Sequence, residues 1–463
     1  MANWIPRGVF WIAQITSRFA AGVLGCAPMA EGLTGFPEWL PEQELVQQHV
    51  IATVRRQFEL HGFTPLLTRS VEKIDDLLKQ GETDKEIYAV QRIHADKDDA
   101  AKIALHYDLT VPFARYTLEH RNQLIFPFRR YQIQPSWRGE RPQHGRFREF
   151  LQADADVIGN GTLPLRFDAE MVHLLRSTLD ALPIPTATLL VNNRKLLEGF
   201  YRGLGIEDIA GTLRIVDKLG KIKDKGVTEQ LSQRGVAADV IDKVLALSKL
   251  ELASAAEVER VRELGVQHEL LEEGLTELGA VLAANEGMTG KVVGALHIAR
   301  GFDYYTGTVV EGVLDGHPEL GSVCSGGRYD NLASGSGVNL PGMGVSIGIT
   351  RLLAYCFGMK LLGQKRRSPA SVLVVVHEEA DRARSNAVAA QLRARGVACL
   401  VADNASAYGK QIKAALQLGI PYAWFPAKDE GPHEVKDLVS ETQSSADPSS
   451  WTPAPERLGL SFA

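Results

Sequence analysis

Apolar residues recur at every fourth position in the segment that follows Gly35-Phe36-Pro37. The series is Val46, Val50, Val54 and Phe58. Pro41 stands at its start, and Gly62 follows its end. Spacing of this kind places apolar side chains on one face of a helix, and proline and glycine are typical of helix boundaries. We therefore expect an amphipathic helix to open the folded part of the chain, after an N-terminal extension over residues 1–33.

Short strand-like runs follow at 102–106, 129–133 and 151–158. In the last run, apolar residues alternate with Gln152, Asp154 and Asp156. A strand over this run therefore has one apolar face and one face that carries an amide and two carboxylates. A solvent-exposed strand gives the same alternation, so a polar site and a plain surface are both open interpretations. Apolar residues in 167–179 then predict a helix that covers the apolar face.

The remaining pattern divides into three parts. Residues 190–290 are mostly helical and charged, which indicates an inserted subdomain, and glycine-punctuated strands return between 300 and 353. Residues 361–368 read as a linker. From 369 to 463 strand-like and helix-like runs alternate, which predicts a separate α/β domain. Its Ser-rich segment 440–453 is expected to be a flexible surface loop.

Composition excludes several classes of protein. A chain of 463 residues exceeds one ordinary core, and its apolar and charged fractions are those of a globular protein. With a net charge of −5, any nucleic acid must be bound through a local basic surface. The four cysteines form no Cys-x-x-Cys pair, so we expect no metal site, no disulfide framework and a cytoplasmic location.

The first thirty residues contain two arginines, no acidic residue and a short apolar cluster. A transit peptide has this composition, but a disordered start is the favoured interpretation. No segment is long enough to cross a membrane.

The candidate chemistry lies in four segments. Residues 129–148 hold six arginines and a single acid, Glu140, within a predicted hairpin. An arginine at the start of its loop could reach a phosphate while the returning strand presents polar groups to the same pocket; an exposed basic hairpin is the alternative. The run Arg300–Tyr305 and the run Gly326–Asp330, which alone indicates only a turn, are two further segments. The fourth, Gly342–Leu352, is a glycine-rich strand leading into a helix, and it has no Gly-Lys-Ser/Thr ending of a Walker loop.

In order and spacing, residues 35–440 resemble the class II aminoacyl-tRNA synthetases, and within them the histidyl-tRNA synthetase family. Trp137–Arg141 and Gly344–Leu352 resemble the second and third class signatures, and Pro65 stands where the first has its proline. Arg300–Tyr305 and Gly326–Asp330 resemble the two segments that mark the histidine family, and Asp108–Tyr116 its amino-acid-binding turn.

The resemblance implies an α+β fold with a mixed, mainly antiparallel sheet flanked by helices. It implies a catalytic domain over 34–360 and an anticodon-binding-type domain over 369–463. The implied activity is ATP-dependent, Mg²⁺-assisted activation of L-histidine to histidyl-adenylate and its transfer to the 3′ end of tRNA(His), by a homodimer.

Roles for single residues also follow from the resemblance alone. The implied catalytic residues are Arg300 and Arg138, both at the α-phosphate. The implied ATP-binding residues are Arg138, Glu140, Arg146 and Arg351. The implied histidine-binding residues are Asp108, Thr110, Gln152, Asp156, Tyr304, Tyr305 and Tyr329. In the hairpin loop, Arg141 and Gln143 are the residues implied to approach the tRNA. Fixed guanidinium groups suit this chemistry, because adenylate formation concentrates negative charge on phosphate oxygens.

Two kinds of related protein without synthetase activity are alternatives. The family's paralogue that serves as a regulatory subunit of ATP phosphoribosyltransferase typically lacks the C-terminal domain and the phosphate-gripping arginines. A synthetase-like RNA sensor would be expected to have lost Arg300 or the pair Tyr304-Tyr305. This sequence keeps all of these features, which favours the enzyme.

Overall fold

The computed structural model describes residues 32–78, 86–94, 101–142, 145–287, 291–299, 304–332, 337–363, 365–428 and 431–458. The predicted N-terminal extension lies outside them, apart from residues 32 and 33. The described residues divide into two compact units. The first comprises residues 32–37 and 50–358, and the second comprises residues 38–49 and 359–458. Each unit is described by itself below.

The predicted first helix is confirmed as α2, Pro41–Leu60. Its four-residue series Val46, Val50, Val54 and Phe58 is completely buried. Gly62 follows the helix with φ of +78°, a conformation that glycine adopts without strain. Burial of one apolar face therefore holds this helix in place.

A mixed sheet dominates the first unit, and nine of its described strands lie in the order β1-β5-β6-β12-β11-β10-β7-β9-β8. The strands are β1 Thr64–Pro65, β5 Phe128–Trp137, β6 Glu149–Ile158, β7 Ala187–Asn193, β8 Glu251–Leu252, β9 Lys291–Ala295, β10 Thr308–Leu314, β11 Ser322–Tyr329 and β12 Gly342–Gly348. Pairing is parallel for β1 with β5 and for β7 with β9, and antiparallel for the others. The predicted fold class, a mixed and mainly antiparallel sheet with helices, is confirmed.

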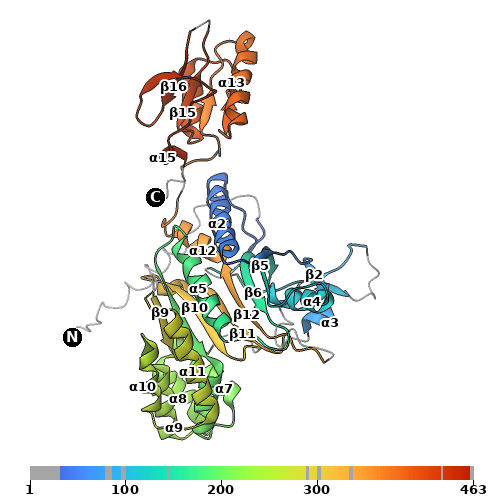
Figure 1. Ribbon diagram of the computed structural model, residues 1–463, viewed down its shortest axis with the longest axis vertical. Coiled ribbons are helices and arrows are strands. Elements are labelled where there is room, and N and C mark those ends of the chain that lie inside the picture. Colours follow the sequence, from blue (N-terminus) through green and yellow to red (C-terminus); the bar gives the residue numbers. More distant parts are fainter. Residues whose placement is uncertain are drawn as a thin grey trace, which may run out of the picture. The chain divides into compact units, whose positions relative to one another are not determined.

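Helices cover this sheet, and most of them lie between β7 and β9 in the sequence. They are α5 Arg166–Asp180, α6 Arg194–Gly203, α7 Ile209–Val216, α8 Leu219–Gln233, α9 Ala238–Ser248, α10 Glu259–Arg262, α11 Glu269–Ala284 and α12 Ile349–Gly358, with 3₁₀ turns η2 Ala255–Val258 and η3 Pro318–Leu320. Figure 1 shows α7 to α11 gathered at one end of the sheet. Residues 190–193 belong to β7 and residues 251–252 to β8, so two parts of the expected helical insertion are strands of the main sheet.

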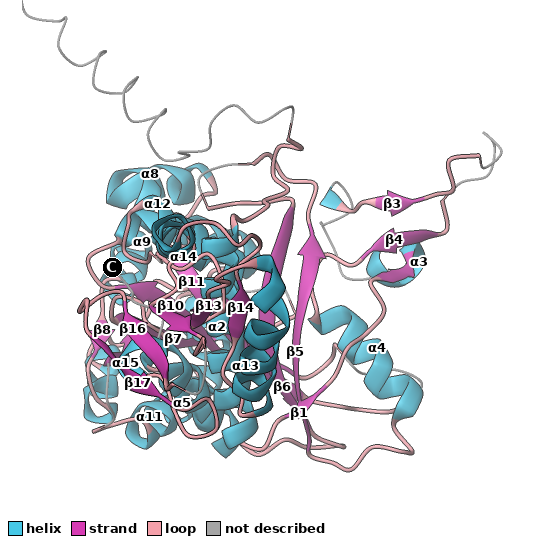
Figure 2. Ribbon diagram, turned by 90° about the horizontal axis from the view of Figure 1, so that it is seen from above, coloured by secondary structure: helices cyan, strands magenta, loops and turns pink. Residues whose placement is uncertain are grey.

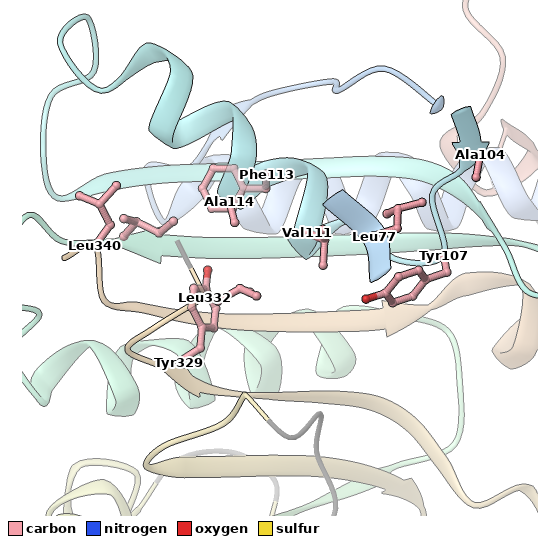
Figure 3. Close-up of a cluster of buried hydrophobic side chains, with 10 residues drawn as sticks. Leu77, Ala104, Tyr107, Val111, Phe113, Ala114, Tyr329, Leu332 and Leu340 are labelled. Carbon is pink, nitrogen blue, oxygen red and sulfur yellow. The ribbon is translucent and has the colours of Figure 1, made fainter. Parts of the chain in front are cut away.

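A small lobe stands beside the sheet. It contains the strands β2 Val71–Lys73, β3 Ala89–Val90 and β4 Ile103–Leu105, in the order β2-β4-β3, and the helices α3 Ile74–Leu78 and α4 Thr110–His120. Figure 2 shows β3, β4 and α3 beside α4, to one side of β5 and β6. Phe113 and Ala114 of α4 belong to the same buried cluster as Tyr329 and Leu340, which come from the far end of the sequence (Figure 3). This cluster fixes the lobe to the sheet at the place where the candidate site lies.

The second unit has a five-stranded sheet in the order β14-β13-β15-β16-β17 within the described residues. Its elements are β13 Val372–Val374, η4 Glu379–Asp381, α13 Arg382–Ala394, β14 Cys399–Val401, α14 Tyr408–Gln417, β15 Tyr422–Phe425, β16 His433–Asp437, β17 Gln443–Ala446 and α15 Pro455–Leu458. The alternation of strands and helices predicted from residue 372 to 425 is confirmed.

The flexible loop predicted over 440–453 is wrong. Residues 443–446 form the strand β17, which pairs antiparallel with β16. Trp451 then packs edge-on against Tyr422 and Trp424, with ring centroids 5.1 and 5.4 Å apart. Three of the four residues of β17 are polar, so this edge strand leaves no hydrophobic alternation in the sequence.

Among the described residues, none of the helices is both long and apolar enough to span a bilayer. The described cysteines, Cys324, Cys356 and Cys399, are buried free thiols.

Candidate active site

A cavity of about 390 Å³ lies over β6, β11 and β12 of the first unit, beside the N-terminal end of α4. Its wall brings together segments that are far apart in sequence: residues 108–110, 138–156, 305–311, 322–329 and 344–351. The four segments singled out from the sequence therefore contribute to one cavity, and the volume is typical of a small-molecule site.

One side of the cavity is lined by acidic and phenolic residues. Six of the seven residues expected to bind histidine lie in this wall: Asp108, Thr110, Gln152, Asp156, Tyr305 and Tyr329. The alternation along β6 thus points its polar face into the cavity, while Ala153, Ala155 and Val157 are completely buried on the other face. The alternative of a solvent-exposed strand is excluded.

The seventh residue, Tyr304, lies next to the cavity and is not part of its wall. Its ring packs edge-on against Tyr305 and Tyr329, with centroids 5.0 and 6.1 Å apart. Its hydroxyl group shares a hydrogen bond with Thr110. The structure therefore places Tyr304 as support for the two tyrosines that do face the cavity.

Asp156 is held by a buried ion pair. Its Oδ2 lies 2.7 Å from Nη2 of Arg130, and its Oδ1 accepts a hydrogen bond of 2.8 Å from the hydroxyl of Tyr329. Arg130 is completely buried, 4.2 Å above the ring of Phe113. Arg130 was not among the residues predicted from the sequence, because six arginines lie in this region and their order along the chain does not reveal which one turns inward.

Glycines in the adjacent strand make room for these side chains. A Cβ atom on Gly344 would lie 2.0 Å from Oδ1 of Asp156, and one on Gly342 would lie 2.2 Å from the ring of Tyr329. Both positions are in β12, which pairs with β6 in a register that sets Gly344 opposite Asp156. Only glycine fits there without displacing a buried polar group.

The run Gly326–Asp330 is part of strand β11 up to Tyr329, so the turn indicated by its local sequence is wrong. Arg328 donates hydrogen bonds to Asp168 at 3.1 Å, to Asp330 at 3.1 Å and to the carbonyl of Leu163 at 2.6 Å. Its guanidinium group is thus engaged within the protein. It holds the end of the strand that presents Tyr329 to the cavity.

Asp108 lies at the start of α4. Its Oδ1 accepts a hydrogen bond of 3.1 Å from the backbone N–H of Val111, in the first turn of the helix. This carboxylate therefore satisfies a helix N–H group and is fixed in orientation.

Burial raises the pKa of each of the three carboxyl groups on the acidic side, Asp108, Asp154 and Asp156. For Asp154 the pKa rises to about 7, because burial outweighs the opposing charge of Arg130. Burial also raises the pKa of the Tyr305 phenol. Three clustered carboxyl groups in such surroundings favour a cationic ligand, which would offset their charge.

Asp154 was part of the alternation on β6, but it was not among the predicted site residues. It lines the cavity between Gln152 and Asp156, with 3% of its surface exposed. Spacing by two residues was the signal that could have identified it.

The other side of the cavity carries arginines. Arg138 donates from Nε to the carbonyl of Tyr107 at 3.0 Å and lies 5.0 Å above the ring of Phe150. Arg351 comes from the first turn of α12 and donates from Nη2 to the carbonyl of Leu320. Both guanidinium groups are thus anchored at one edge, an arrangement that suits recognition of phosphate oxygens.

Glu140 and Arg146 also line this side, where they form an ion pair of 2.7 Å. Arg141 is exposed on the same hairpin and does not line the cavity. Gln143 and Arg300, which were expected to contact tRNA and the α-phosphate, lie outside the described residues.

Comparisons with known proteins identify close relatives. The profile of the family described as histidyl-tRNA synthetase matches residues 35–352. The histidine–tRNA ligase of Micrococcus luteus is 50% identical over 443 residues, which cover 92% of this chain and 97% of that protein. The one from Thermobifida fusca is 49% identical, over 90% of this chain and 97% of that protein.

Solved structures agree with these relatives. The crystal structure of histidyl-tRNA synthetase from a Nostoc species superposes with a TM-score of 0.82 at 32% identity, over 91% of this chain and 97% of that chain. A Bacillus halodurans protein described as an ATP phosphoribosyltransferase regulatory subunit/histidyl-tRNA synthetase superposes with a TM-score of 0.68 at 21% identity, over 84% and 97% of the two chains. The second likeness shows a shared fold.

Proposed function

The chain belongs to the histidyl-tRNA synthetase family and is a histidine–tRNA ligase, and we propose that the cavity described above is where it joins L-histidine to ATP. The product of that step is histidyl-adenylate, and the second step passes the histidine to the 3′ end of tRNA(His). The observation that carries this proposal is a single cavity with carboxylates on one side and arginines on the other.

The two sides suit the two substrates. The acidic side offers acceptors to an ammonium group and an imidazole ring, and it includes Asp156 held by Arg130. The arginine side offers donors to phosphate oxygens through Arg138 and Arg351. The carboxylate of histidine attacks the α-phosphorus, and pyrophosphate leaves. Charge develops on the phosphate oxygens in this step, and fixed guanidinium groups stabilise it.

We assign Arg138 and, from the sequence, Arg300 to the α-phosphate, and Arg351 to the outer phosphates. Glu140 and Arg146 would meet the nucleotide after their ion pair opens. Mg²⁺ would arrive with the ATP phosphates, because phosphate oxygens are its usual ligands in nucleotide sites.

Assembly, location and tRNA contacts are part of the same proposal. The large exposed apolar residues include Leu67 and Ile93, and Leu67 follows β1 at the edge of the main sheet. Apolar surface at such an edge favours a homodimer. Buried, reduced thiols favour the cytoplasm. Arg141 and Gln143 would approach the acceptor end of the tRNA, and the second unit would bind the anticodon.

The test is histidine-dependent exchange of pyrophosphate into ATP, with the other amino acids as controls. We expect exchange with histidine alone, and a fall of about 10²-fold or more in Arg138→Ala and Arg300→Ala. Arg129→Ala is the matched control for Arg138→Ala. Arg129 lies in β5, the strand that ends one residue before Arg138, and it pairs with Glu170 outside the cavity wall. Folded wild-type protein without exchange would contradict the proposal and favour a regulatory subunit.

A further inference from the structure

Asp154 occupies the middle of the acidic side of the cavity. It follows Gln152 and precedes Asp156 at intervals of two residues on β6, so the three side chains share one face. Its side chain is 97% buried, and it lines the cavity. In the register of the sheet it lies opposite Ser346 of β12 and Gln132 of β5.

The carboxylates of the cavity differ in how far the protein satisfies them. Both oxygens of Asp156 are engaged, one by Arg130 and the other by Tyr329. In contrast, Oδ1 of Asp154, Oδ2 of Asp108 and Oε1 of Gln152 are buried and accept no hydrogen bond from the described residues. A buried acceptor without a partner is costly, and in a cavity wall it indicates a ligand that donates to it.

These three acceptors are fixed from behind. The Ser346 hydroxyl accepts a hydrogen bond of 2.9 Å from Nε2 of Gln152 and shares another with Asp154. The backbone N–H of Val111 holds the other oxygen of Asp108 at 3.1 Å. Each residue thus uses one polar atom for the protein and leaves a second atom available.

We propose that Asp154 binds the α-ammonium group of the amino-acid substrate, together with Asp108 and Gln152. An ammonium group has three N–H donors, and the wall offers three acceptors without protein partners. We also expect the ligand to be cationic, because Arg130 forms an ion pair with only one of the three clustered carboxyl groups. This inference rests on the proposed function and adds a residue to its amino-acid site.

The position of Asp154 distinguishes an ammonium contact from an imidazole contact. The family resemblance implies that Gln152 lies near the ammonium group and Asp156 near the imidazole. Asp154 shares Ser346 with Gln152, whereas Asp156 is hydrogen-bonded to Tyr329. Loss of the Asp154 charge should therefore weaken ligands that carry the ammonium group and spare those that lack it.

The experiment measures binding of two ligands by calorimetry, without ATP or tRNA. Histidinol keeps the ammonium group and the imidazole, and 3-(imidazol-4-yl)propan-1-ol lacks the ammonium group. For Asp154→Asn we expect histidinol to bind roughly 10- to 100-fold more weakly, as for loss of a charged hydrogen bond, with the des-amino ligand changed by less than about 3-fold. Asp156→Asn should weaken both ligands.

Asp168→Asn is the matched control, since Asp168 is a fully buried carboxyl group outside the cavity wall. It should leave the ratio of the two affinities unchanged. Asp154→Ser, which is smaller and also neutral, should behave like Asp154→Asn.

An equal loss for both ligands in the Asp154 variants, or no loss for either, would overturn the inference. Failure of the wild-type protein to exchange pyrophosphate with histidine would instead overturn the proposed function. The two failures are separate, because the calorimetric measurement needs no turnover.

Discussion

Replacing Asp154 with asparagine removes a buried carboxyl group from the cavity while keeping the size of the side chain. Burial raises the pKa of this group from 3.8 to about 7, although Arg130 opposes the shift. Asp156 and Asp108 add to it, because their negative charges disfavour a further one. The free protein therefore keeps a group here whose ionised form destabilises the fold.

The change in the pKa of Asp154 gives the size of the effect on folding stability and its dependence on pH. A rise of about 3 pKa units corresponds to roughly 4 kcal/mol, at about 1.4 kcal/mol for each unit. Because the folded pKa lies above the unfolded one, the protonated carboxyl group contributes stability that is fully present below about pH 4. This stability is lost as the pH rises through about 7. Partial hydration of the carboxyl group through the cavity reduces this energy. We therefore expect the free energy of unfolding of Asp154→Asn to exceed that of the wild type by ~1–4 kcal/mol at pH 8.

The assay is urea-induced unfolding of both proteins without substrate, at pH 8, 6.5 and 5.5. The advantage of Asp154→Asn should shrink as the pH falls, because the wild-type carboxyl group takes up a proton. Asp156→Asn is the contrasting control. It leaves the guanidinium group of Arg130 buried without its carboxylate, and it should be less stable than the wild type at each pH. Equal stability of Asp154→Asn and the wild type at pH 8, or a difference independent of pH, would refute the reasoning.

Two further substitutions test how Asp156 is held. Gly344→Ala places a Cβ atom 2.0 Å from Oδ1 of Asp156, so we expect a loss of ~1–3 kcal/mol in urea unfolding and at least a 10-fold fall in histidine-dependent exchange. Unchanged exchange would contradict this. Tyr329→Phe removes the 2.8 Å hydrogen bond to the same oxygen. We expect the KM for histidine to rise roughly 10-fold in exchange kinetics. A KM equal to that of the wild type would show that this bond does not orient Asp156.

Periodicity in the sequence was sufficient to predict the elements that bury one face. The spacing of four in α2 and of two in β6 each correspond to a buried apolar face. On β6 the same alternation also predicted which side chains reach the cavity, because neighbouring residues of a strand point to opposite faces. Asp154 lay within that pattern, so its place on the polar face could be predicted, although its unsatisfied oxygen could not.

Other features depend on contacts between distant segments, and no local pattern predicts them. Arg130 turns inward because Asp156 lies across the strand pair and Phe113 lies beneath its guanidinium group. The strand β17 is held by pairing with β16, and three of its four residues are polar. The sequence alone shows neither that Asp156 is the partner of Arg130 nor that β16 is the partner of β17.

The glycines of β12 leave space for other side chains of the same protein. The space beside Gly342 and Gly344 is filled by Tyr329 and Asp156. The packing of Asp156 and Tyr329 against β12 therefore fixes the orientation of the acidic side of the cavity. Such preorganisation lowers the reorganisation that the substrate must drive, and its cost appears as the buried carboxyl groups whose pKa is raised. Stability and substrate binding should then oppose each other at Asp154, where removing the charge strengthens the fold and weakens the site.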